Sequence, residues 1–170
     1  MNDTLMNISL VGVDEVADRC RLHRLEMLRF GASGGTARVG LAARVTSDAD
    51  RSLLKLRLAA SYSWERGMLR RRLLDYEVDA VFEVDDFERH FGRGPHSPEV
   101  VDMPPSVLRL MLTVAVGALR GMIALRTAGT PLGSRPLPLV NVSELLGRLI
   151  YGSEAARSQS VYPLTAMVVA

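Results

Sequence analysis

Three consecutive segments alternate apolar and polar residues with a period of two, and this pattern constrains the fold more than any other feature. The segments are 37–45, 54–64 and 74–85, and the third alternates most regularly. Side chains along a β-strand point to opposite faces in turn, so each segment predicts a strand with one buried face and one wet face. With short connections, the three strands are expected to pair as an antiparallel meander.

The two connections of this meander are polar. Residues 46–51 are rich in Ser and Asp, and residues 65–72 end in Arg70, Arg71 and Arg72. We therefore predict that the arginine cluster forms a turn.

Upstream of the meander, residues 8–27 carry a weaker pattern. Ile8 and Leu10 at one end and Leu22 and Leu25 at the other end are apolar, and a charged stretch lies between them. We predict a strand in this segment, with a helix as the alternative.

A long helix is predicted after the sheet. Residues 92–105 contain four prolines and two glycines, which is typical of an irregular connection, and Ser106 can then cap a helix over 107–126. This helix is long enough for a bilayer, but Arg109 and Arg120 lie within it. The two charges favour the buried helix of a soluble protein, with no insertion into a membrane.

The predicted helix is apolar nearly all round, whereas its own sheet needs an apolar stripe of only about 100°. The remaining apolar surface predicts that the protein forms oligomers. Small residues at Ala115, Gly117, Ala118 and Gly121 would let a second backbone approach closely. They would equally let the helix lie flat on its own sheet, so both interpretations stand.

A linker and a second helix follow. Residues 129–140 are rich in Pro and Leu, and Asn141 or Ser143 can cap a helix that runs to about Tyr151. The apolar segment 161–170 could then dock as a strand or bind elsewhere like a ligand.

The length of 170 residues fits one domain with tails. We predict a single domain over residues 1–151 and a C-terminal tail over residues 152–170. The polar start of the chain lacks the features of a secretory signal, and a single cysteine, Cys20, fits a reducing compartment. We therefore expect a cytoplasmic protein.

No catalytic pattern is recognisable in the chain. Cys20 and His23 would face opposite sides of a strand, and the glycine-rich residues 31–35 precede a strand and lack the lysine of a phosphate-binding loop. The carboxylates within residues 75–85 are predicted to form a solvated strand face. The three histidines share no metal-ligand spacing, so we expect no enzyme activity, no metal site and no cofactor.

The composition also argues against nucleic-acid binding. Aromatic residues make up 5% of the chain and the formal net charge is only +2. Single-stranded nucleic acids are bound by clustered basic residues interleaved with aromatic side chains. Non-catalytic binding of some other partner is therefore the default class of function.

Residues 114–146 resemble the C-terminal part of the SecB family of export chaperones. The similarity is most specific in the loop Pro-Leu-Pro-Leu-Val-Asn over 136–141 and in the Leu145-Leu146 pair that follows. A weaker similarity covers Tyr76-Glu77-Val78. The resemblance implies an α+β fold: a four-stranded antiparallel sheet, a long helix, a crossover loop and a shorter C-terminal helix.

The resemblance also implies a function. It predicts an ATP-independent holdase that binds unfolded polypeptides or preproteins and keeps them competent for translocation, as a homotetramer built as a dimer of dimers. Glu77 would be the contact for the SecA motor. The alternatives are a SecB-like chaperone dedicated to a toxin–antitoxin or other specific partner, and a non-catalytic oligomeric structural protein.

The client groove of such a holdase would be lined by apolar residues of the crossover loop and the final helix. Simple core packing of the same residues is the alternative. The predicted lining residues are Leu132, Pro136, Leu137, Pro138, Leu139, Val140, Leu145, Leu146 and Ile150.

Overall fold

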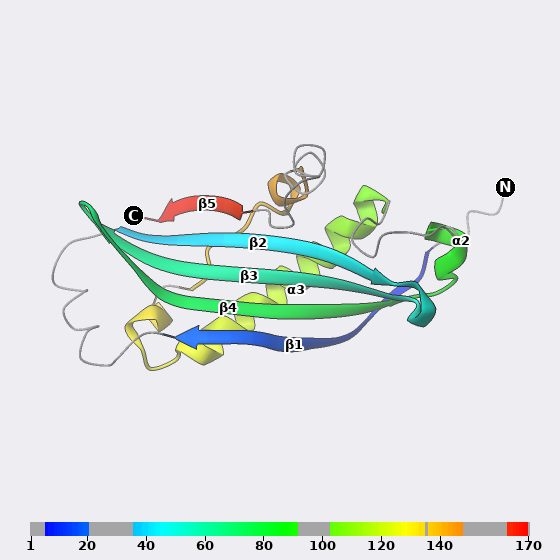
Figure 1. Cartoon of the computed structure of the whole chain (residues 1–170), viewed down its shortest axis with the longest axis horizontal. Coiled ribbons are helices and arrows are strands. Elements are labelled where there is room, and N and C mark those ends of the chain that lie inside the picture. Colours follow the sequence, from blue (N-terminus) through cyan, green and yellow to red (C-terminus); the bar gives the residue numbers. More distant parts are fainter. Residues whose placement is uncertain (1–5, 21–35, 92–102, 135, 148–162, 170) are drawn as a thin grey trace.

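The computed structural model describes residues 6–20, 36–91, 103–134, 136–147 and 163–169. Its centre is an antiparallel sheet in the order β1-β4-β3-β2-β5. Figure 1 shows the strands running lengthwise through the molecule, with β1 and β5 at the two edges. The strands are β1 (Ile8–Cys20), β2 (Thr36–Asp48), β3 (Leu53–Arg66), β4 (Leu69–Val84) and β5 (Pro163–Val169).

The predicted meander is confirmed. β2 pairs with β3 and β3 pairs with β4, both antiparallel, and the 3-10 helix η1 (Ala49–Arg51) makes the first connection. The connection predicted over 65–72 is wrong, because a two-residue turn at Gly67 and Met68 joins the strands and Arg70–Arg72 belong to β4. A hairpin that extends beyond the covered core has two wet faces, so its ends need not alternate in polarity.

The strand prediction for the N-terminal segment is confirmed over β1, while residues 21–27 lie outside the described residues. β1 pairs antiparallel with β4, from Ile8 opposite Val84 to Cys20 opposite Leu74. Two register shifts, between Leu10 and Gly12 and between Glu15 and Ala17, interrupt the pairing. Each shift inserts an extra residue, which explains the weak alternation in the sequence.

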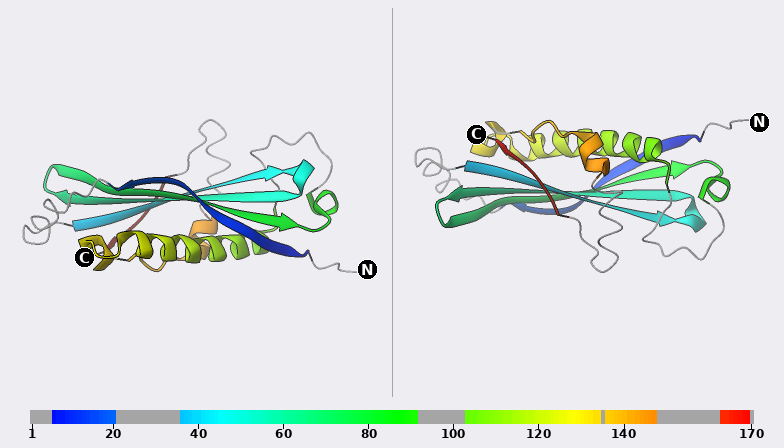
Figure 2. Two further views of the ribbon diagram at one scale, coloured as in Figure 1. Left: turned by 90° about the horizontal axis from the view of Figure 1, so that it is seen from below. Right: turned by 90° about the horizontal axis from the view of Figure 1, so that it is seen from above.

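After the short helix α2 (Phe87–Phe91), the long helix α3 (Pro105–Thr127) lies along one face of the sheet (Figure 2). It begins earlier than predicted. Pro104 is the N-cap and Pro105 opens the helix, so Ser106 lies in the first turn instead of capping it. Proline is well suited to this position because the first helical N–H has no partner within the helix.

The core forms between α3 and the covered face of β2, β3 and β4. Leu54, Leu56 and Leu58 of β3 are buried, as are Met111 and Leu119 of α3. By length and composition α3 could cross a membrane, with 39% of its most apolar window buried within this chain. In this structure one side of α3 is buried in the core.

The chain then passes through the 3-10 helix η2 (Pro131–Ser134) and an extended crossover segment over 136–141 to a short helix over 142–147. The predicted order of sheet, long helix, crossover and shorter helix is therefore confirmed. β5 adds a fifth strand, since it pairs antiparallel with β2. Of the two alternatives for the C-terminal apolar segment, the structure has the docked strand. The domain boundary between residues 151 and 152 stays a prediction.

Candidate polypeptide-binding surface

The outward face of α3 between Ser106 and Leu125 is poor in charge, with the exposed Arg109 at its edge. The residues on this face, three or four apart in the helix, are Ser106, Leu110, Thr113, Gly117, Gly121 and Ala124, with Val114 and Leu125 at its margin. We call this set the α3 outer face. A surface helix normally presents many charged residues on the side away from its core, so an outer face with so little charge points to a contact surface.

Two leucines of α3 are exposed at the outer face and its margin. Leu125 is 81% exposed, and Leu110 is half exposed. Gly117 and Gly121 lie between them along the helix, and a Cβ atom built on either glycine would meet no heavy atom within 4 Å. The centre of the α3 outer face is therefore flat and open, while leucines stand toward both ends.

The predicted interface residues divide between the two sides of α3. Ala115 is fully buried in the core, and Ala118 is half-buried. Gly117 and Gly121 are exposed. Of the predicted set, the two glycines are the residues that a second backbone could reach without unfolding the chain.

The crossover segment is held against α3 by Arg120. The Arg120 Nε donates a hydrogen bond to the Leu137 carbonyl oxygen over 3.2 Å, and Nη2 donates one to the Pro138 carbonyl oxygen over 2.8 Å. A charged donor makes stronger hydrogen bonds than a neutral one. Arg120 therefore fixes the backbone immediately before Leu139, which is 81% exposed.

Asn141 ends the crossover segment and caps the short helix. Its Oδ1 accepts hydrogen bonds from the backbone N–H groups of Ser143 and Glu144, over 3.1 and 3.3 Å. Of the two predicted caps, Asn141 is the one that the structure has. The cap fixes where the helix begins, and thereby directs Leu145 and Leu146 into the core.

The predicted groove residues fall into two groups. Leu132, Leu137, Leu145 and Leu146 are buried in the core, as in the alternative of simple core packing. Pro136 and Leu139 are exposed, Pro138 and Val140 are half-buried, and Ile150 lies outside the described residues. Leu139 is thus the predicted lining residue with the largest exposed apolar side chain.

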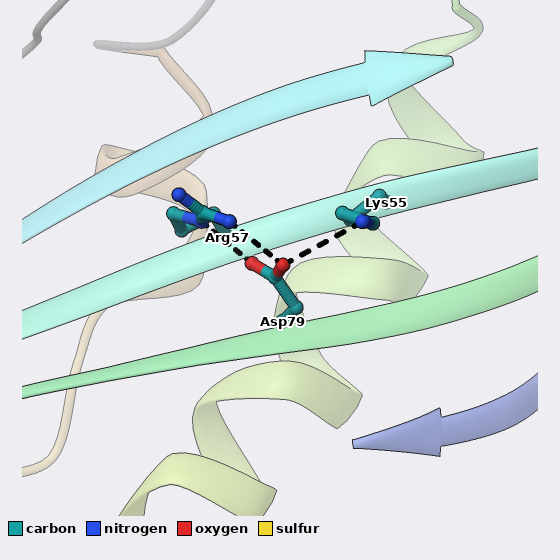
Figure 3. A network of polar contacts seen from close by, with 3 residues as sticks. All are labelled: Lys55, Arg57 and Asp79. Carbon is teal, nitrogen blue, oxygen red and sulfur yellow. Dashed lines mark hydrogen bonds and ion pairs between the residues drawn. The ribbon is translucent and has the colours of Figure 1, made fainter. Parts of the chain in front are cut away.

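On the opposite face of the sheet, Asp79 of β4 joins two cations of β3 (Figure 3). Its carboxylate accepts hydrogen bonds from Arg57 Nε and Nη2 over 2.7 and 2.8 Å, and Lys55 Nζ lies 3.7 Å away. The hydrogen bonds from Arg57 lower the pKa of Asp79. The prediction of a solvated carboxylate face is wrong for Asp79, which is only 6% exposed.

Glu77, the predicted contact for a motor protein, lies on this same outer sheet face. It is half-buried between Ala59 of β3 and Ala17 of β1, which are its register partners. Asp75 on the next row forms an ion pair with Arg72 over 3.1 Å. Glu77 is therefore reachable from outside, in a row of small side chains.

A second polar group, which the sequence did not indicate, joins β1 to the helix layer. Asp18 of β1 forms an ion pair with Arg126 at the end of α3, and the Tyr76 hydroxyl donates a hydrogen bond to Glu15. The insertion of Val16 in β1 places Glu15 and Asp18 in the rows of Val78 and Tyr76, on the covered side. A prediction that assumes regular alternation cannot find this arrangement, because the arrangement depends on a β-bulge.

Within the described ranges, no group of three His, Cys, Asp or Glu side chains is arranged to hold a metal ion. Cys20 is exposed and forms no disulfide. His23, the predicted neighbour of Cys20, lies outside the described residues.

No protein-family model and no curated protein matches the chain. A search of solved structures finds the Mycobacterium tuberculosis Rv1957 SecB-like chaperone, in complex with a ChAD peptide from the Rv1956 HigA1 antitoxin. The two chains share 17% sequence identity, and the match covers 78% of this chain and 88% of that chain with a TM-score of 0.44.

Proposed function

We propose that the protein is an ATP-independent chaperone that binds non-native polypeptides through exposed leucines of its helix layer. The observation that carries the proposal is the exposure of Leu125 and Leu139, each 81%. Leu139 stands on a segment that Arg120 holds in place. A preorganised apolar group binds with a smaller loss of conformational entropy than a mobile one.

Such a surface selects its clients by physical state. Native proteins bury most of their large apolar side chains, whereas unfolded chains expose them along their length. Full burial of one leucine contributes about 1.5 to 3 kcal/mol, so a few contacts along one client give useful affinity without a deep pocket. Binding of this kind needs no nucleotide or metal.

The open centre of the α3 outer face supports a second part of the proposal, namely that the protein is a homo-oligomer. Gly117 and Gly121 leave room for a second helix to approach closely. A second copy on this face would bring the exposed Leu139 of each protomer into one particle. A homotetramer of two dimers is the assembly that we propose.

Preproteins awaiting translocation are one proposed class of clients, and Glu77 is the proposed contact for the SecA motor. Its exposure on the outer sheet face leaves it accessible when the helix layer is occupied. The proposed site of action is the cytoplasm, where such clients are found.

The test is the light scattering of a thermally unfolding model substrate, with and without the protein and without ATP. The wild-type protein is expected to suppress aggregation, and Leu139→Ser together with Leu125→Ser should lose most of that suppression. Met68→Ser is the matched control, since Met68 is fully exposed at a different part of the molecule. Leu137 is unsuitable as a target because it is buried in the core.

Each other outcome has a definite meaning. A folded wild-type protein that protects no generic substrate would contradict the general holdase. Protection of one coexpressed partner alone would then identify a dedicated chaperone. Equal loss in the Met68→Ser control would show that overall apolarity, and not the helix layer, holds the client.

A further inference from the structure

The tip of the β3–β4 hairpin exposes two large apolar side chains side by side. Met68 is 105% exposed and Leu69 is 67% exposed. They follow Gly67, whose positive φ of 56° suits the first central position of a two-residue hairpin turn. The tight turn holds both side chains outward, so the chain cannot cover them by a small movement.

The hairpin reaches past its neighbouring strands. The pairing of β1 with β4 ends at Leu74, and the pairing of β2 with β3 begins at Glu65. Figure 1 shows the turn between β3 and β4 curling away at one end of the sheet. Among the described strands, none flanks Met68 and Leu69.

Arginines surround the tip on both faces of the hairpin. The register pairs Trp64 with Arg71 and Glu65 with Arg70, which places Arg66 and Arg71 on one face and Arg70 on the other. Arg72 follows on the same face as Arg70. All four arginines are exposed.

Three ion pairs are seen among the described residues at this end of the hairpin. Glu65 lies 2.8 Å from Arg38 and 3.4 Å from Arg70, and Asp75 lies 3.1 Å from Arg72. Residues 64–75 contain four arginines and two carboxylates, Glu65 and Asp75. The end of the hairpin keeps a positive charge although the whole chain has a formal net charge of only +2.

We propose that this hairpin tip is a docking surface for an anionic lipid membrane. Met68 and Leu69 would enter the boundary between headgroups and acyl chains, and the surrounding arginines would contact lipid phosphates. Peripheral proteins bind negatively charged leaflets in this way, with exposed apolar side chains surrounded by basic residues. The contact is peripheral, and it places no helix across the bilayer.

Nucleic acid fits the same surface less well. Its phosphates would satisfy the arginines, but two aliphatic side chains would then remain in water at the point of closest approach. Binding to single strands relies on aromatic stacking, and the tip residues 66–72 contain no aromatic side chain. Apolar exposure together with positive charge therefore favours the membrane.

The test is flotation of the full-length protein with vesicles of phosphatidylcholine alone and of equal parts phosphatidylcholine and phosphatidylglycerol. The protein is expected to float with the anionic vesicles only, and less so as salt is raised. Met68→Ser combined with Leu69→Ser keeps every charge and should reduce the bound fraction about tenfold, the effect of losing two partly buried apolar groups. Arg66→Gln combined with Arg70→Gln should reduce it to a similar extent.

Two matched controls separate the tip from general effects. Arg51→Gln removes a charge in the β2–β3 connection, away from the tip, and Leu110→Ser removes an exposed leucine from α3. Neither should change flotation. A Met68→Cys variant in a Cys20→Ser background, labelled with an environment-sensitive dye, should show a blue shift with anionic vesicles.

Three results would overturn the proposal. They are the absence of flotation with anionic vesicles at low salt, flotation that the Met68→Ser and Leu69→Ser changes leave intact, and tighter binding to DNA than to vesicles that likewise survives those changes. The holdase activity is measured separately with soluble substrates, so the failure of either proposal leaves the other testable.

Discussion

Arg120 and Pro138 are joined by a hydrogen bond of 2.8 Å from the Arg120 guanidinium to the Pro138 carbonyl oxygen, and this bond ties the crossover segment to the middle of α3. Arg120 is half-buried, and its second hydrogen bond goes to the Leu137 carbonyl oxygen. Arg120, a charged residue in a largely apolar helix, therefore has a structural role. It orients the backbone that presents Leu139.

Replacing Arg120 with Met keeps the apolar stem and removes both hydrogen bonds. We expect the free energy of unfolding to fall by about 1 to 3 kcal/mol, because two carbonyl oxygens lose a charged donor. Amide hydrogen exchange should speed up around residues 137–141 more than in β3. Arg120→Lys, which keeps one donor group, should lie between wild type and Arg120→Met. Unchanged exchange in Arg120→Met would contradict the anchoring role.

Gly121→Leu tests the proposed oligomer contact on the α3 outer face. A Cβ at this position meets nothing within 4 Å in the single chain, and leucine favours a helix over glycine by roughly 0.8 kcal/mol. The folded protomer should therefore be at least as stable as wild type, while the larger side chain blocks close helix packing. Size-exclusion chromatography with light scattering should show a smaller particle. The milder Gly121→Ala should keep the wild-type mass, and a monomeric wild type would refute the contact.

Asp79→Asn should destabilise the protein by about 2 kcal/mol, since Arg57 and Lys55 would lose their shared carboxylate at a nearly buried position. The folded-state pKa of Asp79 is lowered, so its stabilising contribution is fully present above the unfolded value of about 3.9 and is lost as pH falls through the folded value. Wild type and Asp79→Asn should converge in stability in acid. Glu83→Gln, at an exposed position on the same strand face, is the control.

Tyr62→Phe should leave the stability unchanged or raise it by up to about 1 kcal/mol. The Tyr62 hydroxyl is buried and has no hydrogen-bond partner among the described residues. Burying it costs free energy that no hydrogen bond offsets, and the change to Phe removes this cost. Thermal unfolding followed by circular dichroism measures the difference. Tyr76→Phe is the matched variant, and it should be destabilising because the Tyr76 hydroxyl donates a hydrogen bond to Glu15. A clear loss of stability in Tyr62→Phe would point to a partner for its hydroxyl.

Stability should also fall in strong alkali. Burial raises the pKa of Tyr62 to about 12, and burial together with the Glu15 carboxylate raises that of Tyr76 to about 12. Both groups keep their protons longer in the folded state, so their contribution is present below the unfolded value of about 10 and is lost as pH rises toward 12. Titration of tyrosinate absorbance should show two tyrosines with a raised pKa in the folded protein, and tyrosines with the ordinary pKa in denaturant.

The sheet could be predicted wherever one face of a strand is buried along its length. β2, β3 and most of β4 satisfy this condition, and their alternation is visible in the sequence. β1 alternates less clearly because its two register shifts each insert a residue. The first residues of β4, including Arg70–Arg72, have no buried face, so the sequence pattern there resembles that of a loop.

The candidate site was harder to predict. Leu137 and Leu139 are two residues apart in the same proline-rich segment, yet one is buried and the other is exposed. The sequence gives both the same apolar character, and the difference arises from the hydrogen bonds of Arg120, which fix how the segment lies. Arg120 donates its hydrogen bonds to backbone carbonyl oxygens, and such partners cannot be recognised from the types of residues in the sequence.

The sheet order has a consequence for biosynthesis. β1 is made before the meander, but its partner strand is β4, so Ile8 must wait for Val84 to leave the ribosome. The hairpins β2–β3 and β3–β4 join near neighbours and can form as they emerge, whereas closing the long interval between β1 and β4 carries a greater entropic penalty. During that interval Leu10 and Val13 of the nascent chain have no strand to cover them. A protein proposed to shelter unfinished chains would thus pass through such a state itself, with its oldest strand docking only after the meander is complete.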